Sequence, residues 1–99
     1  MTQSNPIEIT FGSDNIFEDL GFNSEEATNL KIRADLMLTL RSFIQEKRWT
    51  QQEAATFFEE TKPKISDLMN GEISRFTVDK LLSLLDKMGM KVKLEIFTK

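Results

Sequence analysis

Apolar residues recur at every third or fourth position from residue 30 to residue 44, which is the spacing of one helix face. They are Leu30, Ala34, Met37, Leu40 and Ile44. Either Asn23 or Ser24 can cap the start of this helix, and Glu25 and Glu26 suit the positive end of its dipole. The pattern therefore predicts a helix from about residue 24 to about residue 47.

Three shorter helices follow, and each is opened by a threonine that can cap it. The threonines are Thr50, Thr61 and Thr77. Glu53 completes a Thr-x-x-Glu capping box in the first of these helices. Pro63 lies in the first turn of the second, where its missing N–H is harmless, and Asn70-Gly71 ends that helix. Gly89 ends the third.

At both ends of the chain the apolar positions recur every second residue, which is typical of a strand. They are Ile7, Ile9 and Phe11 near the start, and Met90, Val92, Leu94 and Ile96 near the end. Residues 12–15 have turn chemistry, and residues 16–20 suit a single helical turn closed by Gly21. We therefore expect a strand at each end of a helical protein.

The C-terminal strand needs a neighbour, because a lone strand leaves its N–H and C=O groups unpaired. We expect Met90, Val92, Leu94 and Ile96 to pair with a second copy of the chain in a dimer. Pairing with residues 7–11 of the same chain is the second arrangement, and pairing with the sheet of a partner protein is the third.

Composition argues against an enzyme. The chain of 99 residues has neither cysteine nor histidine, so it lacks thiolate chemistry, the commonest general base and the commonest metal ligand. No carboxylates are spaced as a recognisable metal or acid–base site, so we expect no cofactor and no metal. No apolar run is long enough to span a membrane and the start is unlike a signal peptide, which predicts a cytoplasmic protein.

The net charge of the chain is −3, and the charges are unevenly distributed along it. Residues 1–30 contain six acidic residues and no lysine or arginine, whereas residues 31–49 contain five basic residues and two acidic ones. Local patches decide how strongly phosphate is attracted, so a basic face remains possible. A weakly basic face predicts modest affinity of one copy for a polyanion, which dimerisation multiplies.

Residues 50–71 carry the most informative pattern, two short capped helices joined by a tight turn. This is the helix-turn-helix arrangement, in which the second helix enters the DNA major groove while the first braces it. Such helices cross closely only where small residues separate them, and Ala54 and Ala55 supply these. We therefore expect a single-domain protein with an arm at 1–23, a helix-turn-helix domain at 24–89 and the strand at 90–99.

This stretch resembles the XRE, lambda-repressor-like family. The matching positions are Thr50-Gln51, Ala54-Ala55, Ile65 and Asn70-Gly71. Residues 15–97 also resemble HigA-like antitoxins through Asn15–Phe22, Lys62–Ser66 and the C-terminal strand. The resemblance implies a mainly α fold, a lambda-repressor-like bundle of four to five helices with a C-terminal β-strand paired across a dimer.

Two residues depart from the family pattern. The family usually has glycine in the turn, where the backbone is left-handed, and a small apolar residue next, whereas this chain has Glu59 and Glu60. A non-glycine residue in the left-handed region costs about 1 kcal/mol, so we expect a reshaped or lengthened turn. Two adjacent carboxylates near DNA would also repel phosphate.

The resemblance implies DNA contacts by nine residues, several of which also have a purely structural interpretation. They are Thr50, Gln51, Thr61, Lys62, Pro63, Lys64, Asp67, Asn70 and Arg75. Gln51 and Asn70 would meet phosphates and Arg75 would add charge, while the residues between them would contact base edges. The structural alternatives are helix caps for the two threonines, ordinary surface positions for the lysines and an ion pair with lysine for Asp67.

The resemblance implies a sequence-specific transcriptional repressor that is also the antitoxin of a HigB/RelE-type toxin–antitoxin system and autoregulates its operon. Its partners would be operator DNA, a second copy and a basic ribonuclease toxin, which the acidic arm would cover. One alternative is a stand-alone or prophage XRE-type regulator with no toxin. Another is a protein–protein adaptor that has lost DNA binding, which Glu59, Glu60 and the negative net charge suggest.

Overall fold

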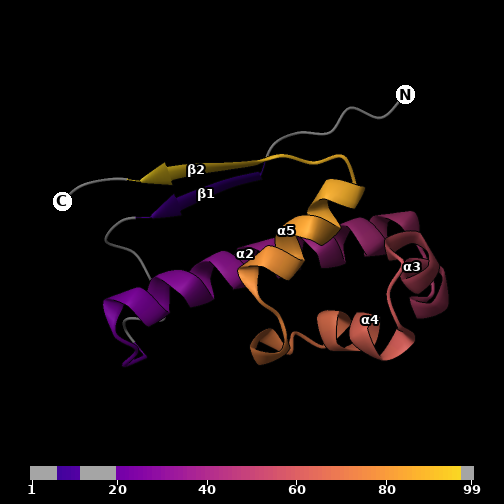
Figure 1. The fold of residues 1–99 in the computed structure, drawn as a ribbon, viewed down its shortest axis with the longest axis horizontal. Coiled ribbons are helices and arrows are strands. Elements are labelled where there is room, and N and C mark those ends of the chain that lie inside the picture. Colours follow the sequence, from indigo (N-terminus) through magenta and orange to yellow (C-terminus); the bar gives the residue numbers. More distant parts are fainter. Residues whose placement is uncertain (1–6, 12–19, 97–99) are drawn as a thin grey trace.

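The computed structural model describes residues 7–11 and 20–96 of the chain. The predicted turn at 12–15 and most of the predicted helical turn at 16–20 lie outside the described residues. The described part is mainly helical, with a long helix crossed by three shorter ones and a small sheet (Figure 1). None of its helices is long and apolar enough to cross a membrane.

The elements follow the predicted order. The helices are α2 (Ser24–Lys47), α3 (Gln51–Phe58), α4 (Lys62–Met69), the 3-10 turn η1 (Ile73–Arg75) and α5 (Val78–Lys87). The strands are β1 (Ile7–Phe11) and β2 (Val92–Ile96). In Figure 1, α2 runs the length of the molecule with α5 alongside it, and α3 and α4 lie at the end where α2 finishes and below it.

Side-chain caps fix where the helices start, as the sequence predicts. The Oδ1 atom of Asn23 accepts a hydrogen bond from the backbone N–H of Glu26 at 2.8 Å, so Asn23 rather than Ser24 caps α2. Thr77 caps α5 by accepting from the N–H of Lys80 at 3.1 Å. Each cap satisfies one of the backbone donors that a helix start leaves unpaired.

The core lies between α2 and the three shorter helices. It contains Leu36, Met37, Leu40 and Ile44 from α2, Ala54, Ala55 and Phe58 from α3, Ile65 and Leu68 from α4, Phe76, and Leu81, Leu84 and Leu85 from α5. The predicted stripe on α2 is buried only in its second part, because Leu30 and Ala34 are half-buried near the start of the helix. The core therefore supports α3 and α4 from behind and leaves their outer sides exposed.

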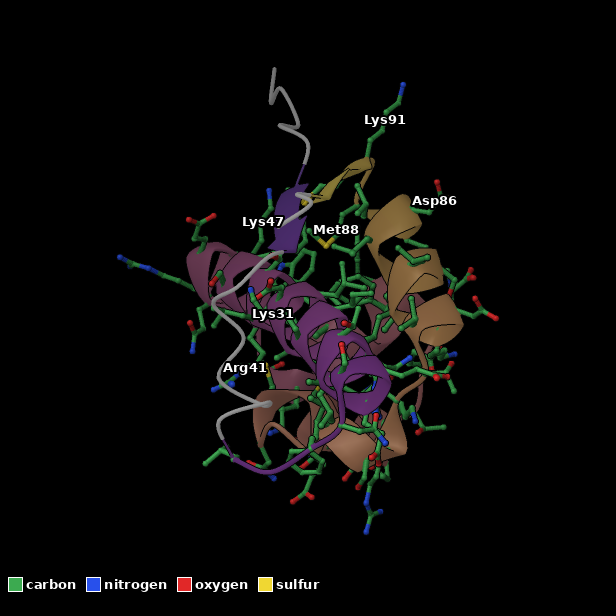
Figure 2. The ribbon with its side chains drawn as sticks, turned by 90° about the vertical axis from the view of Figure 1, so that its left-hand side faces the viewer. Lys31, Arg41, Lys47, Asp86, Met88 and Lys91 are labelled. Carbon is green, nitrogen blue, oxygen red and sulfur yellow. The ribbon has the colours of Figure 1, made fainter. Side chains whose placement is uncertain are left out.

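β1 and β2 pair in parallel within one chain, with Ile7 opposite Val92 and Phe11 opposite Ile96. This is the second arrangement considered from the sequence. The edge of β2 that we expected to pair with a second copy pairs with β1 instead. A parallel pair needs a long connection, and the whole helical domain provides it. The strands lie on the side of α2 and α5 that faces away from α4 (Figures 1 and 2).

Candidate nucleic-acid interface

The helices α3 and α4 pack directly against each other through small and apolar residues. Ala54 and Ala55 are almost fully buried, with 0% and 3% of their surface exposed, so the backbones can approach closely at the crossing. Phe58, Ile65 and Leu68 fill the space behind it. The pair is therefore held as a unit, and the outer side of α4 is left free of core packing.

The turn between these helices is short, because only the residues from Glu59 to Thr61 separate them. Glu59 adopts the left-handed conformation with φ 57° and ψ 44°, and the N–H of Glu60 donates to the carbonyl of Ala55 at 2.9 Å. We expected a reshaped or lengthened turn, but the turn is short. Glu59 takes the backbone conformation that glycine would adopt and carries the associated strain.

Two lysines of α5 neutralise the acidic turn. The Nζ atom of Lys87 donates to the carbonyl of Phe58 at 2.6 Å and to Oε1 of Glu59 at 3.0 Å. Lys80 forms an ion pair with Glu60, whose side chain is only 14% exposed. The carboxylates that would repel phosphate are therefore paired with α5, and the backbone carbonyl at the end of α3 gains a charged donor.

At the start of α3, Thr50 and Glu53 form the predicted capping box. Thr50 Oγ1 accepts from the N–H of Glu53 at 3.1 Å, and Glu53 Oε1 accepts from the N–H of Thr50 at 2.8 Å. The hydroxyl oxygen of Thr50 is thereby used within the protein. Gln51, the first residue of α3, is half-buried, and no hydrogen bond to its side chain is formed within the described part of the chain.

The start of α4 presents a cation to solvent. Thr61 caps the helix by accepting from the N–H of Lys64 at 3.2 Å, and Pro63 lies in the first turn, as predicted. Lys62 and Pro63 are exposed. Among the described residues, none forms a hydrogen bond or ion pair with Lys62. Lys62 can therefore reach a phosphate or a base edge without first breaking an intramolecular contact.

Lys64 is placed differently from Lys62, although we expected both to contact DNA. Its Nζ atom donates to the carbonyl of Arg75 at 2.6 Å and lies 4.2 Å from the centre of the Phe76 ring. The side chain therefore ties α4 to the end of η1 and to Phe76, which follows it. Its predicted contact with a base edge remains a prediction, and in the free protein its ammonium group is already occupied.

Asp67 and Arg75 form an ion pair, with Oδ2 and Nη1 separated by 3.6 Å. The Asp67 side chain is 25% exposed and that of Arg75 is 64% exposed. The partner of Asp67 is thus an arginine rather than the lysine that the structural alternative assumed. The pair places a carboxylate and a guanidinium together at the outer side of α4.

Asn70 and Gly71 end α4. Gly71 has φ 73°, which requires the conformational freedom of glycine. The N–H groups here are internally bonded, because that of Gly71 donates to Leu68 and that of Glu72 donates to Asp67. The backbone amides near Gly71, which we expected to meet phosphate, are therefore occupied, whereas the exposed Asn70 side chain makes only a 3.5 Å contact with Ser66 Oγ.

Two residues that lie in this region were not among the site residues predicted from the sequence. Ser66 lies one turn after Lys62 on α4 and is half-buried. Arg41 reaches from α2 to the end of α4, where its Nη1 atom lies 3.7 Å from the position of a Cβ on Gly71. The helical period places Ser66 beside Lys62 and was a usable signal. No local signal connects Arg41 with Gly71, because their proximity depends on packing.

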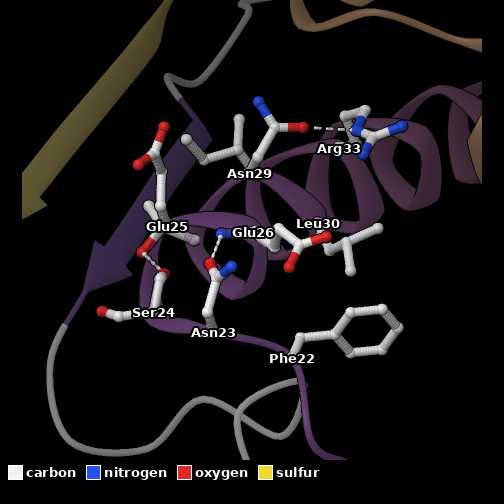
Figure 3. A pocket seen from close by; sticks show the side chains of 10 residues that line it. Phe22, Asn23, Ser24, Glu25, Glu26, Asn29, Leu30 and Arg33 are labelled. Atoms are coloured by element: carbon white, nitrogen blue, oxygen red, sulfur yellow. Dashed lines mark hydrogen bonds between the residues drawn. The ribbon is translucent and has the colours of Figure 1, made fainter.

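A pocket lies elsewhere, at the first turns of α2 (Figure 3). It has a volume of about 1090 Å³ and is open, with Phe22, Glu26 and Arg33 among its lining residues. Arg33 is held there by Asn29 at 2.7 Å and by the carbonyls of Ile73 and Phe76. Among the described residues, no group of acidic side chains is arranged to hold a metal ion.

Comparisons with known proteins match this geometry. A family model described as a helix-turn-helix domain matches residues 16–97. A solved structure described as a putative XRE family transcriptional regulator superimposes with a TM-score of 0.67 at 28% sequence identity, and the match covers 75% of this chain and 83% of that one. No curated protein matches the chain.

Proposed function

The chain belongs to the helix-turn-helix domain family, and from this premise we propose that it is a DNA-binding transcriptional repressor whose α4 reads the major groove. One observation carries the proposal: α4 is braced from behind by α3 and the core, while Lys62 at its start is exposed and has no partner among the described residues. An exposed, rigid helix with a free cation is what major-groove recognition requires. The likeness to a structure described as an XRE family regulator adds support.

The contacts follow from this placement. Gln51 at the start of α3 binds a backbone phosphate, and Lys62 and Pro63 reach base edges. Asp67 accepts from a base amino group while Arg75 holds it, and Asn70 binds phosphate beyond the helix. Thr50 and Thr61 act through the caps that orient these residues, and Lys64 acts through its bridge to Arg75.

The pairing of Glu59 and Glu60 with lysines favours DNA binding over the adaptor alternative. That alternative rested on two uncompensated carboxylates beside the recognition helix, and both are compensated by α5. The negative net charge remains, so affinity depends on local cations and on the number of copies bound.

Selection from a random-sequence duplex library tests this function. We expect the protein to enrich one sequence and to bind it with an affinity that falls steeply as salt rises, because each phosphate contact releases counterions. The binding is measured by fluorescence anisotropy at four salt concentrations. No enrichment, or binding that is insensitive to salt, would contradict the proposal.

We also propose that two copies bind the operator as a homodimer. An open apolar groove of about 450 Å³ lies between α2, α5 and the start of β2, and Met90, Val92 and the 39% exposed Leu82 line it. One edge of β2 is paired with β1, and no other described strand pairs with the second edge, where we propose that a second copy adds. Leu94 and Ile96 of β2 complete the proposed dimer contact.

Sedimentation velocity tests the homodimer. We expect the wild-type chain to sediment as a dimer, and Leu82→Lys to shift it towards the monomer by placing a charge in the apolar contact. Leu38→Lys is the matched control, because Leu38 is 59% exposed and does not line this groove. A wild-type chain that remains monomeric at every concentration would contradict the proposal.

The antitoxin role is a further part of the proposal. Glu25 and Glu26 are exposed at the start of α2, beside Leu20 and Phe22, which are 68% and 43% exposed. An acidic surface with apolar residues complements a basic ribonuclease of the HigB/RelE type. The test is whether the neighbouring gene encodes a small basic protein whose toxicity is relieved by co-expressing this chain. A neighbouring gene of another kind would favour a stand-alone regulator.

A further inference from the structure

Arg41 is a cation at the C-terminal end of α4 with which no described residue pairs. It projects from α2 on the same side as Lys31 and Lys47 (Figure 2). Its Nη1 atom lies 3.7 Å from the position of a Cβ on Gly71, which is ordinary van der Waals contact. Its Nε atom is buried and donates to no residue that the structure describes, so this donor is unpaired there. Within the described part of the chain, the guanidinium makes no hydrogen bond or ion pair.

The other arginines of the same region are held by the protein. Arg33 donates to the carbonyls of Ile73 and Phe76 at 3.0 and 3.3 Å, and so joins α2 to the loop after η1. Arg75 is paired with Asp67. A guanidinium has five donors in a planar fork, and leaving a buried one unpaired is costly. Within the described residues the donors of Arg41 have no acceptor, so the guanidinium is available to an acceptor from outside them.

The backbone beside Arg41 cannot supply donors of its own. The N–H groups of Gly71, Glu72 and Ile73 donate to carbonyls of Leu68, Asp67 and Gly71, respectively. A phosphate that approached the end of α4 would find these amides occupied. It would meet the exposed Asn70 side chain and the Arg41 guanidinium instead.

We propose that Arg41 binds a backbone phosphate of the DNA beside the C-terminal end of α4. The inference rests on the proposed DNA-binding function and adds a residue from outside the two helices of the motif. Lys62 lies at one end of α4 and Arg41 at the other. The helix has eight residues and is ~12 Å long, which is about the width of the major groove. Arg41 at the C-terminal end is therefore placed to meet a phosphate at the edge of the groove whose bases Lys62 contacts.

A structural role for Arg41 gives a different result and is an outcome of the test. A cation at a helix C-terminus also stabilises the helix through its dipole, without any DNA. Loss of that interaction lowers stability and leaves the salt dependence of DNA binding unchanged. Loss of a phosphate contact lowers the slope of log affinity against log salt by about one.

The experiment uses the full chain and the duplex that the wild-type protein enriches from a random-sequence library. Three variants are compared with wild type by fluorescence anisotropy at four salt concentrations, and circular dichroism confirms that each is folded at the assay temperature. Arg41→Met keeps the aliphatic stem and removes the charge, and Arg41→Lys keeps the charge. Lys31→Met is the matched control, because Lys31 is another cation of α2 whose ammonium group is already paired with Asp35.

We expect Arg41→Met to weaken binding about tenfold on every duplex tested and to lower the salt slope by about one. Arg41→Lys should keep the slope, and Lys31→Met should match wild type in both measurements. An Arg41→Met variant with the wild-type slope would overturn the inference, whatever its stability. A wild-type protein that enriches no duplex would instead contradict the proposed function, and the inference with it.

Discussion

The lysines of α5 and the lysine at the start of α4 carry the same charge but serve different purposes. Lys80 and Lys87 each pair with a glutamate of the turn, and Lys87 also donates to the end of α3. Lys62 is exposed and has no partner among the described residues. The comparison separates cations that hold the helix-turn-helix unit together from cations that are available to DNA, and charge alone does not make this distinction.

Lys64 lies between these two classes. It is two residues from Lys62, yet its ammonium group is bound by the carbonyl of Arg75 and the ring of Phe76. Before Lys64 can bind a phosphate, its ammonium group must give up the hydrogen bond to Arg75 and the contact with Phe76. We therefore expect substitutions at Lys62 and Lys64 to act on different quantities.

The largest effect is expected for DNA binding by Lys62→Ala. Loss of a free cation at the start of α4 should weaken binding to the enriched duplex by about 1–3 kcal/mol. The free energy of unfolding should stay within about 0.5 kcal/mol of wild type, because no internal contact is lost. Anisotropy titrations and urea unfolding measure the two quantities, and a variant that binds normally would show that α4 is not the recognition helix.

Lys64→Met should act first on stability. The substitution keeps the apolar stem but removes the donor to Arg75 and the cation above Phe76, so we expect unfolding to become easier by about 1 kcal/mol. Urea unfolding is compared with that of Lys62→Met, which changes the same group without breaking a contact. Equal stabilities of the two variants would remove the distinction between these lysines.

Glu60→Gln tests the pairing of the turn with α5. The variant removes the ion pair with Lys80, and we expect a loss of about 0.5–1 kcal/mol, because the pair is only partly exposed to solvent. High salt should reduce the difference from wild type if screening acts on the pair. A difference that does not respond to salt would mean that packing of the side chain, rather than its charge, matters here.

Glu59→Gly should have the smallest effect, and its sign is informative. Relief of the left-handed strain favours the variant by about 1 kcal/mol, while loss of the exposed pair with Lys87 opposes it by a few tenths. We expect a net gain of about 0.5 kcal/mol in urea unfolding. Glu59→Ala keeps the strain and loses the pair, so it should be less stable than wild type. The reverse order would mean that the pair outweighs the strain.

The local features of this fold could be predicted well from the sequence. The caps by Thr50, Thr61 and Thr77 are confirmed, as is the capping box with Glu53. Each depends on atoms within three residues of one another, so the spacing of residue types was sufficient. The tight turn was the local exception. A glutamate at position 59 predicts a turn without a left-handed residue, but the packing of α3 on α4 imposes the left-handed conformation there.

The candidate site could be predicted only in outline. The exposure of Lys62 and Pro63 follows from the helical period, which puts Ile65 and Leu68 inside. The occupation of Lys64 by Arg75, eleven residues away, does not follow from it. Nor does the partner of Asp67, because a carboxylate on a helix surface can meet any cation that the fold brings near.

The sequence by itself determined where helices begin and end and which face of each is apolar. It also determined that two short helices, with small residues where they cross, form a helix-turn-helix unit. The tertiary structure alone decided that α5 neutralises the turn over separations of 20 and 28 residues, that β2 pairs with β1, and that Arg41 reaches Gly71. The physical reason is the range of the interactions. Caps and periodic faces act within one or two turns of chain, whereas ion pairs between elements exist only after the core has fixed how those elements pack.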